Sequence, residues 1–161
     1  YASAGNTIEL AREADMIIGA VLIPGAAAPK LISRAQLSEL KPGAALVDVA
    51  IDQGGCFETS KATTHDDPTY VIDDVVHYCV ANMPGAVART ATMALTNATL
   101  PYIMRLASEE VGSLLLKDRH FSAGLNIVRG HLTHRAVADA LGQTWTEPDQ
   151  ILRASLHLKS A

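Results

Sequence analysis

Apolar and polar residues follow one another along the first half of the chain in blocks that predict an α/β fold. Continuous apolar runs at residues 16–22 and 45–51 have the length and composition of buried parallel strands. Capping residues ahead of residues 8–14 and 34–40 predict a short helix before each strand. The order helix, strand, helix, strand is typical of a parallel sheet with right-handed crossover connections.

Further along the chain, strands give way to helices. Two more short strands are predicted at residues 70–72 and 75–80. After them the sequence favours helices at residues 90–97, 100–106, 133–141 and 148–154. We therefore place a domain boundary between residues 1–88 and residues 89–161.

Three of the predicted strands end in loops of small or polar residues. These loops begin with Pro24-Gly25, Asp52-Gln53-Gly54 and Asn82-Met83-Pro84. The carboxyl ends of parallel strands share one edge of a sheet, and ligands bind in the crevice there. We expect Asp52 at the tip of its strand, with glycines behind it that let a flat cofactor approach the backbone. The alternative is an Asx turn in which Asp52 only caps loop amides.

Composition narrows the classes of protein that remain. Of the 161 residues 48% are apolar, which is enough for a packed core. The net charge of −4 makes nucleic acid a poor partner, and no apolar run is long enough to span a membrane. Cys56 and Cys79 lack metal-type spacing, and we expect reduced thiols in a cytoplasmic protein, with one disulfide as the alternative. The chain begins at Tyr1 in mid-pattern, which suggests a fragment or a processed chain.

Five ungapped stretches carry a family resemblance: residues 20–26, 47–59, 63–70, 76–87 and 94–102. They resemble the family of bacterial alanine dehydrogenases and nicotinamide nucleotide transhydrogenase α-subunits, with similarity from Tyr1 to about Glu147. Transhydrogenases typically lack the acid that stands here as Asp52. This residue therefore favours the alanine dehydrogenase branch.

The resemblance implies an incomplete Rossmann-type parallel sheet followed by C-terminal helices. Residues 1–88 correspond to the back half of an NAD-binding domain, and residues 89–161 to helices that rejoin the substrate domain. The missing first half would carry the phosphate loop and the groups that handle alanine or pyruvate. The chain contains no Gly-x-Gly-x-x-Gly motif. We therefore expect it to be inactive alone.

The resemblance also implies the site residues. Asp52 would lie beside the nicotinamide and the substrate carbon, where a carboxylate assists proton transfer or stabilises an iminium or carbinolamine. Asn82 would bond the carboxamide or the ribose, with a simple turn residue as the alternative. The full set of expected NAD-binding residues is Val21, Leu22, Val49, Ala50, Ile51, Asp52, Val80, Ala81, Asn82 and Met83.

For several other residues the sequence supports only a general prediction. Ala2 stands where family members often have a hydroxyl near the adenosine, which puts that contact in question. We expect no metal site: Arg105 and Glu109 are a poor ligand pair for a hard cation. His131 and His134 are expected at the surface, and Cys56 as an ordinary small residue. His65 is expected in a polar loop near the crevice, and His77 as a hydrogen-bonded strand residue.

The resemblance implies part of an NAD-dependent L-alanine dehydrogenase. Such an enzyme catalyses the reversible oxidative deamination of L-alanine to pyruvate and ammonia in L-alanine catabolism. The family implies a cytoplasmic homo-oligomer, usually a hexamer, that acts on a small molecule. The alternatives are an NAD-binding module of transhydrogenase type, which needs no Asp52 carboxylate, and a non-catalytic remnant that pairs with other subunits. A continuous reading frame upstream of Tyr1 would argue against the remnant.

Overall fold

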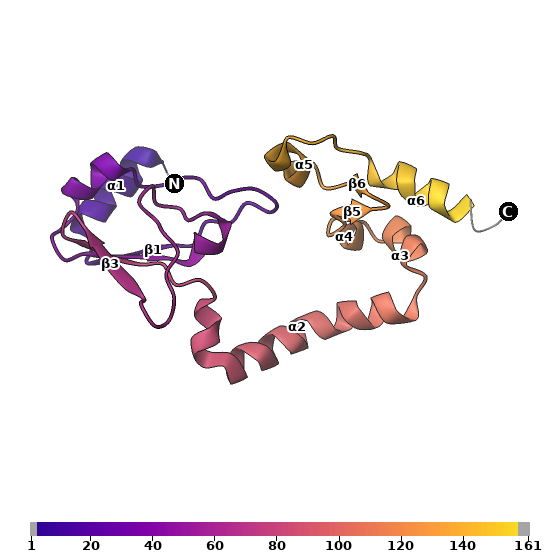
Figure 1. Ribbon diagram of the computed structural model, residues 1–161, viewed down its shortest axis with the longest axis horizontal. Coiled ribbons are helices and arrows are strands. Elements are labelled where there is room, and N and C mark those ends of the chain that lie inside the picture. The colour runs from indigo at the N-terminus through magenta and orange to yellow at the C-terminus, as the bar shows by residue number, and fades with distance from the viewer. Residues whose placement is uncertain (1–2, 158–161) are drawn as a thin grey trace. The chain divides into compact units, whose positions relative to one another are not determined.

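The computed structural model describes residues 3–157, so the expectation for Ala2 lies outside the described residues. The chain divides into two compact units, and the boundary falls after Val87. The short segment Pro24–Ala26 groups with the second unit. Figure 1 shows the elements of both units in chain order.

The first unit is built on a four-stranded sheet in the order β1-β2-β4-β3. Strands β1 (Met16–Gly19), β2 (Ala45–Asp48) and β4 (Val75–Tyr78) are parallel to their neighbours. Strand β3 (Thr69–Ile72) runs antiparallel to β4. The predicted α/β fold with a mainly parallel sheet is therefore confirmed, with an antiparallel strand at one edge.

The turn between β3 and β4 explains the antiparallel pair. Asp73 and Asp74 form it, with positive φ angles of 50° and 60°. Two successive residues of positive φ are typical of the tight turns whose twist matches a hairpin. Aspartate tolerates this conformation better than most residues, because its short polar side chain bonds locally.

Both long predicted strands end earlier than expected. β1 stops at Gly19, and β2 stops at Asp48, where the 3₁₀ helix η2 (Val49–Gln53) begins. The expectation that Asp52 lies at a strand tip is therefore wrong. The apolar residues of this stretch predicted a longer strand, but apolar periodicity cannot distinguish a strand from a buried helical turn.

The core of the first unit lies between the sheet and the segments that cover it. Its largest fully buried apolar side chains are Ile32, Leu37, Leu46, Phe57, Val75 and Val80. Helix α1 (Ala4–Glu13) adds Ala11, and it begins earlier than predicted because the Ser3 side chain accepts a hydrogen bond from the Asn6 N–H. The 3₁₀ helix η1 (Arg34–Glu39) buries Leu37 against the same core.

The second unit is mostly helical. After η3 (Met83–Val87), helix α2 (Ala88–Ser108) continues through Pro101 without interruption, although two helices were predicted there. The remaining elements are α3 (Val111–Lys117), α4 (Arg119–Ser122), β5 (Ile127–Val128), β6 (His131–Leu132), α5 (Arg135–Leu141) and α6 (Pro148–His157).

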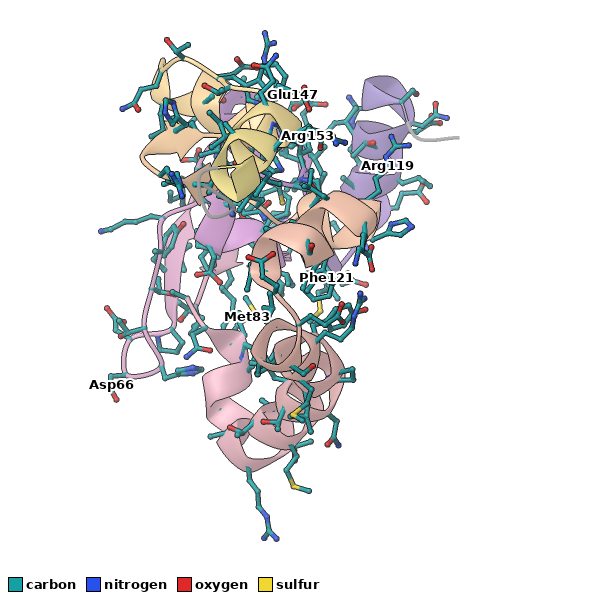
Figure 2. All side chains as sticks on the ribbon, turned by 90° about the vertical axis from the view of Figure 1, so that its right-hand side faces the viewer. Asp66, Met83, Arg119, Phe121, Glu147 and Arg153 are labelled. Atoms are coloured by element: carbon teal, nitrogen blue, oxygen red, sulfur yellow. The ribbon has the colours of Figure 1, made fainter. Side chains whose placement is uncertain are left out.

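Several of these elements were not predicted or begin at other residues. The antiparallel pair of β5 and β6 turns at Arg129 and Gly130, both of positive φ. Helix α5 starts two residues later than predicted, because the Thr133 hydroxyl donates to the Leu125 carbonyl at 3.0 Å instead of capping the helix. Phe121 of α4, labelled in Figure 2, stacks under the Arg105 guanidinium at 4.9 Å.

Within the described part of the chain, no helix is both long and apolar enough to cross a membrane.

Candidate functional site

The candidate site lies at the carboxyl edge of the sheet in the first unit. β2 and β4 are neighbouring parallel strands, so the segments that follow them leave the sheet side by side at one edge. The segments after β2 and β4 lie wholly in the first unit, whereas Pro24–Ala26, which follow β1, group with the second unit. Ligands of open α/β sheets bind at such an edge.

Asp48 anchors the exit of β2 from inside the protein. Its side chain is fully buried. The carboxylate accepts a hydrogen bond from the Cys56 N–H at 2.8 Å, another from the Ser60 hydroxyl, and a weaker one from the Cys56 thiol at 3.4 Å. A carboxylate can be buried at low cost in free energy when hydrogen-bond donors of the protein replace the water molecules that it loses. Asp48 therefore closes the loop from the end of β2 back to Cys56.

Two glycines allow this closure. Gly54 and Gly55 have φ angles of 86° and 72°, in the left-handed region that L residues with a side chain rarely adopt. A Cβ on Gly55 would lie 2.7 Å from Asp48 Oδ2 and 2.5 Å from Ser60 Cβ. A Cβ on Gly54 would meet no atom within 4 Å, so this side of the turn is open.

The turn of η2 separates its side chains into two sets. Ala50 and Ile51 are each only 7% exposed and face the core. Asp52 is exposed, and the Val49 side chain is 49% exposed. The structure therefore turns the Asp52 carboxylate outward at the carboxyl edge, on a turn that buried groups hold in place.

The exit of β4 forms the neighbouring part of the site. Val80 is fully buried, and the Thr63 segment pairs with this exit, since the Ala81 N–H donates to the Thr63 carbonyl at 3.1 Å. Asn82 is exposed with a φ of 56°, and its carbonyl accepts from His65 Nε2 at 3.0 Å. His65 thus lies beside the β4 exit. Met83, labelled in Figure 2, follows half-buried at the start of η3.

The exit of β1 contributes two of the predicted residues. Val21 is half-buried and packs against the core, while Leu22 is 66% exposed. An exposed leucine after β1 offers an apolar surface to a ligand.

The remaining candidates have structural surroundings. His77 is fully buried: its Nδ1 lies 3.0 Å from the Val75 carbonyl, and its Nε2 lies 2.8 Å from the Thr59 hydroxyl, which confirms a hydrogen-bonded strand residue. Burial, together with Asp48, raises the pKa of the Cys56 thiol to about 12, so this cysteine is a packed, unreactive group.

The two histidines expected at the surface differ from each other. His131 is exposed, but His134 is half-buried, and a Cβ on Gly25 would lie 2.6 Å from its ring. The surface expectation is therefore wrong for His134. Arg105 forms ion pairs with Glu109 and Asp118, at 3.0 Å and 2.7 Å. Among the described residues, no three His, Cys, Asp or Glu side chains gather closely enough to hold a metal ion.

Sequence reasoning missed two residues that shape the site. Asp48 could have been recognised in the sequence, because an acid inside the apolar run Val47-Asp48-Val49 needs buried hydrogen-bond donors. No sequence pattern indicates the role of Lys30. Its ammonium donates to the carbonyls of Gly54 and Gly55, which lie more than twenty positions away in the sequence.

These features define a class: an α/β unit with a mainly parallel sheet, whose carboxyl edge presents an acid on a glycine-closed turn. Comparison with known proteins is consistent with this class. Residues 1–135 match the family described as alanine dehydrogenase/PNT, C-terminal domain. The chain belongs to this family.

Individual relatives agree. The chain is 62% identical to the alanine dehydrogenase of Halomonas elongata over 152 residues, which are 94% of this chain and 41% of that protein. It is 49% identical to the alanine dehydrogenase of Mycolicibacterium smegmatis, again over 94% of this chain and 41% of the relative. The chain thus spans about two fifths of the length of these curated relatives.

Solved structures show the same likeness. An L-alanine dehydrogenase matches with a TM-score of 0.70 and 44% identity, over 88% of this chain and 39% of that one. A transhydrogenase from Sinorhizobium meliloti matches with a TM-score of 0.55 and 29% identity, over 65% of this chain and 31% of that one.

Proposed function

We propose that this chain forms part of an NAD-dependent L-alanine dehydrogenase, in which it supplies the nicotinamide side of the cofactor site and one catalytic acid. The reaction is the reversible oxidative deamination of L-alanine to pyruvate and ammonia. The observation that carries the proposal is the exposed Asp52 carboxylate on the turn after β2. The buried Asp48 carboxylate holds this turn in place. Membership of the alanine dehydrogenase/PNT family supports it.

The residues present fit a flat dinucleotide at this edge. The open space beside Gly54 leaves room for a planar ring against the backbone of η2. Val49, Ala50 and Ile51 would offer backbone contacts there, and Asn82 would offer its amide from the neighbouring exit loop. Leu22 and Val21 would cover the ribose or adenine side. NAD, when bound, supplies the acceptor or donor of the hydride.

Asp52 is the group that this chain contributes to the chemistry. Its carboxylate would hold the substrate ammonium, or a water that adds to or leaves the substrate carbon. Held in place in advance, a carboxylate stabilises a developing positive charge without reorganising during the reaction. It also accepts and returns a proton at its oxygen atoms. The anchored turn suits such a role, because a loosely held acid would lose this advantage.

The test uses a completed enzyme, defined as the Halomonas elongata alanine dehydrogenase in which this chain replaces the matching segment. It should oxidise NADH in the presence of pyruvate and ammonium. Asp52→Asn should lower turnover by about 10²–10³, the typical loss when one aimed electrostatic group is removed. The dissociation constant for NADH and the melting temperature should change little, because an amide retains the shape of the carboxylate.

Asp66→Asn is the matched control. Asp66 is an exposed acid that points outward from the loop before β3 (Figure 2), and its substitution should leave turnover unchanged. If the Asp52→Asn enzyme melts normally and keeps near-wild-type turnover, Asp52 is only a turn residue and the proposal is wrong.

A second candidate is an NAD-binding module of transhydrogenase type, which the likeness to the Sinorhizobium meliloti structure favours. It predicts that the completed protein binds NADH yet shows no oxidation that depends on pyruvate. The Asp52 carboxylate favours the alanine dehydrogenase, because a module that binds no amino acid does not require an acid at this position.

The proposal includes a cytoplasmic homo-oligomer, a hexamer as in the family. Both cysteines are free and buried, which suits a reducing compartment. Helix α2 has no buried residue, and its apolar side chains, such as Leu95 and Ile103, are exposed enough to pack against other chain segments. Light scattering of the completed enzyme measures the oligomeric state.

A further inference from the structure

The ammonium of Lys30 ties down the far end of the turn that carries Asp52. Its Nζ donates to the Gly54 carbonyl at 2.6 Å and to the Gly55 carbonyl at 2.7 Å. These two residues directly follow η2. A lysine ammonium has three donors and no fixed plane, so it can serve two neighbouring carbonyls at once.

The two glycines need such an external restraint. Both have positive φ, and glycine has more conformational freedom to lose than any other residue. Their N–H groups are bonded within the turn, to the Ile51 carbonyl from Gly54 and to the Ala50 carbonyl from Gly55, and Lys30 supplies the bonds to their two carbonyls. Charge-assisted hydrogen bonds are about twice as strong as neutral ones, so the Lys30 bonds are a substantial restraint on these planes.

Lys30 itself sits on a segment that is docked along the turn. The Ala28 N–H donates to the Gln53 carbonyl at 3.0 Å, and the Leu31 N–H donates to the Cys56 carbonyl at 2.7 Å. Lys30 therefore reaches the glycine carbonyls from a backbone that is itself hydrogen-bonded on both sides. Asp48 holds the same loop from inside the core, so the turn is fixed from two directions.

We propose that Lys30 is a positioning residue for Asp52: by binding the Gly54 and Gly55 carbonyls it fixes the turn from which the Asp52 carboxylate acts. This inference rests on the proposed function of Asp52. A displacement of about 1 Å at a reacting group costs up to about 10²-fold in rate, so loss of this restraint should be visible in turnover.

The test compares three lysine variants in the completed enzyme. Lys30→Met keeps the aliphatic stem and removes the donors, and it should lower kcat by about 10-fold to 100-fold. Lys30→Arg keeps a cation with several donors and should retain more turnover than Lys30→Met. Lys41→Met is the matched control, because Lys41 pairs with Asp15 at 2.9 Å on the surface before β2, and kcat should not change.

Two further readouts separate positioning from a general loss of structure. The NADH dissociation constant of Lys30→Met should stay near wild type, and the variant should still melt in one cooperative transition, at a modestly lower temperature because two hydrogen bonds are lost. Amide hydrogen exchange in the peptide that spans residues 49–56 should become faster in Lys30→Met and remain unchanged in Lys41→Met. The exchange measurement needs no enzymatic activity, and it overturns the inference if exchange is the same in all variants.

A double-mutant cycle distinguishes this inference from the proposed function. If Lys30 acts through Asp52, Lys30→Met should cause little further loss in an Asp52→Asn background. A full additional loss, or wild-type kcat in Lys30→Met alone, overturns the positioning role while the Asp52 assignment stands. If Asp52→Asn itself retains turnover, the proposed function fails first, and the positioning role fails with it.

Discussion

Two aspartates four positions apart have different roles because their surroundings differ. Asp48 is fully buried and accepts hydrogen bonds from the Cys56 N–H, the Cys56 thiol and the Ser60 hydroxyl. Asp52 is exposed at the carboxyl edge. A carboxylate whose hydrogen bonds are all internal holds structure, whereas an exposed one is free to meet a substrate. At the scale of single residues, burial therefore decides which acid is structural and which is a candidate for chemistry.

His77 gives the first unit a pH-dependent stability. Burial lowers the pKa of His77, because the charged imidazolium would lose its hydration in the core. The unfolded chain, with an ordinary histidine pKa of about 6.5, then binds more protons than the folded one as the pH falls. The stabilisation that a neutral His77 provides is complete above about pH 6.5 and is lost as the pH falls toward the lowered folded-state pKa.

Melting of the completed enzyme between pH 8 and pH 5 measures this effect. The melting temperature should fall on acidification, and His77→Gln should melt lower at pH 8 but depend less on pH. His131→Gln, at an exposed position, is the control and should retain the wild-type slope. Equal slopes for wild type and His77→Gln would exclude His77 as the source.

At the scale of elements, the turn after β2 depends on its two glycines to different degrees. Ala at position 54 has open space, so Gly54→Ala should cost only the left-handed strain of about 1–2 kcal/mol. Ala at position 55 adds clashes with the Asp48 carboxylate and with Ser60. Gly55→Ala should therefore also disturb buried hydrogen bonds, at an additional cost of about 1–3 kcal/mol.

Thermal melting of the two variants in the completed enzyme checks this order. We expect Gly55→Ala to melt well below Gly54→Ala, and Gly54→Ala below wild type. Turnover should fall with Gly55→Ala as well, since the same turn carries Asp52. If both variants melt alike, the close packing of Gly55 against Asp48 does not contribute to stability.

At the scale of the whole molecule, we expect the 161-residue chain alone to bind NADH weakly or not at all. Its sequence holds no glycine-rich phosphate loop, which in dinucleotide-binding folds places the pyrophosphate at a helix N-terminus. Fluorescence titration of the purified chain with NADH, beside the completed enzyme, is the measurement. Submicromolar binding by the chain alone would contradict this expectation.

The sequence by itself determined the α/β class, the residues at which β1, β2 and β4 begin, and the acid and glycines of the loop that follows β2. These features depend on local patterns: apolar runs, capping residues and glycines act within a few positions of the chain. The family also followed from long ungapped stretches, and the match over residues 1–135 confirms it.

Only the tertiary structure decided where β2 ends, how β3 is oriented and what holds Asp52. The apolar run from Ala45 to Ile51 is compatible with a strand throughout, and the buried Asp48 network bends it into η2. Helix α2 continues through Pro101 although the sequence favoured a break. Lys30 meets Gly54 and Gly55 because the segments 28–31 and 53–56 dock along each other. Such contacts join residues that are far apart in the chain, and local periodicity carries no information about them.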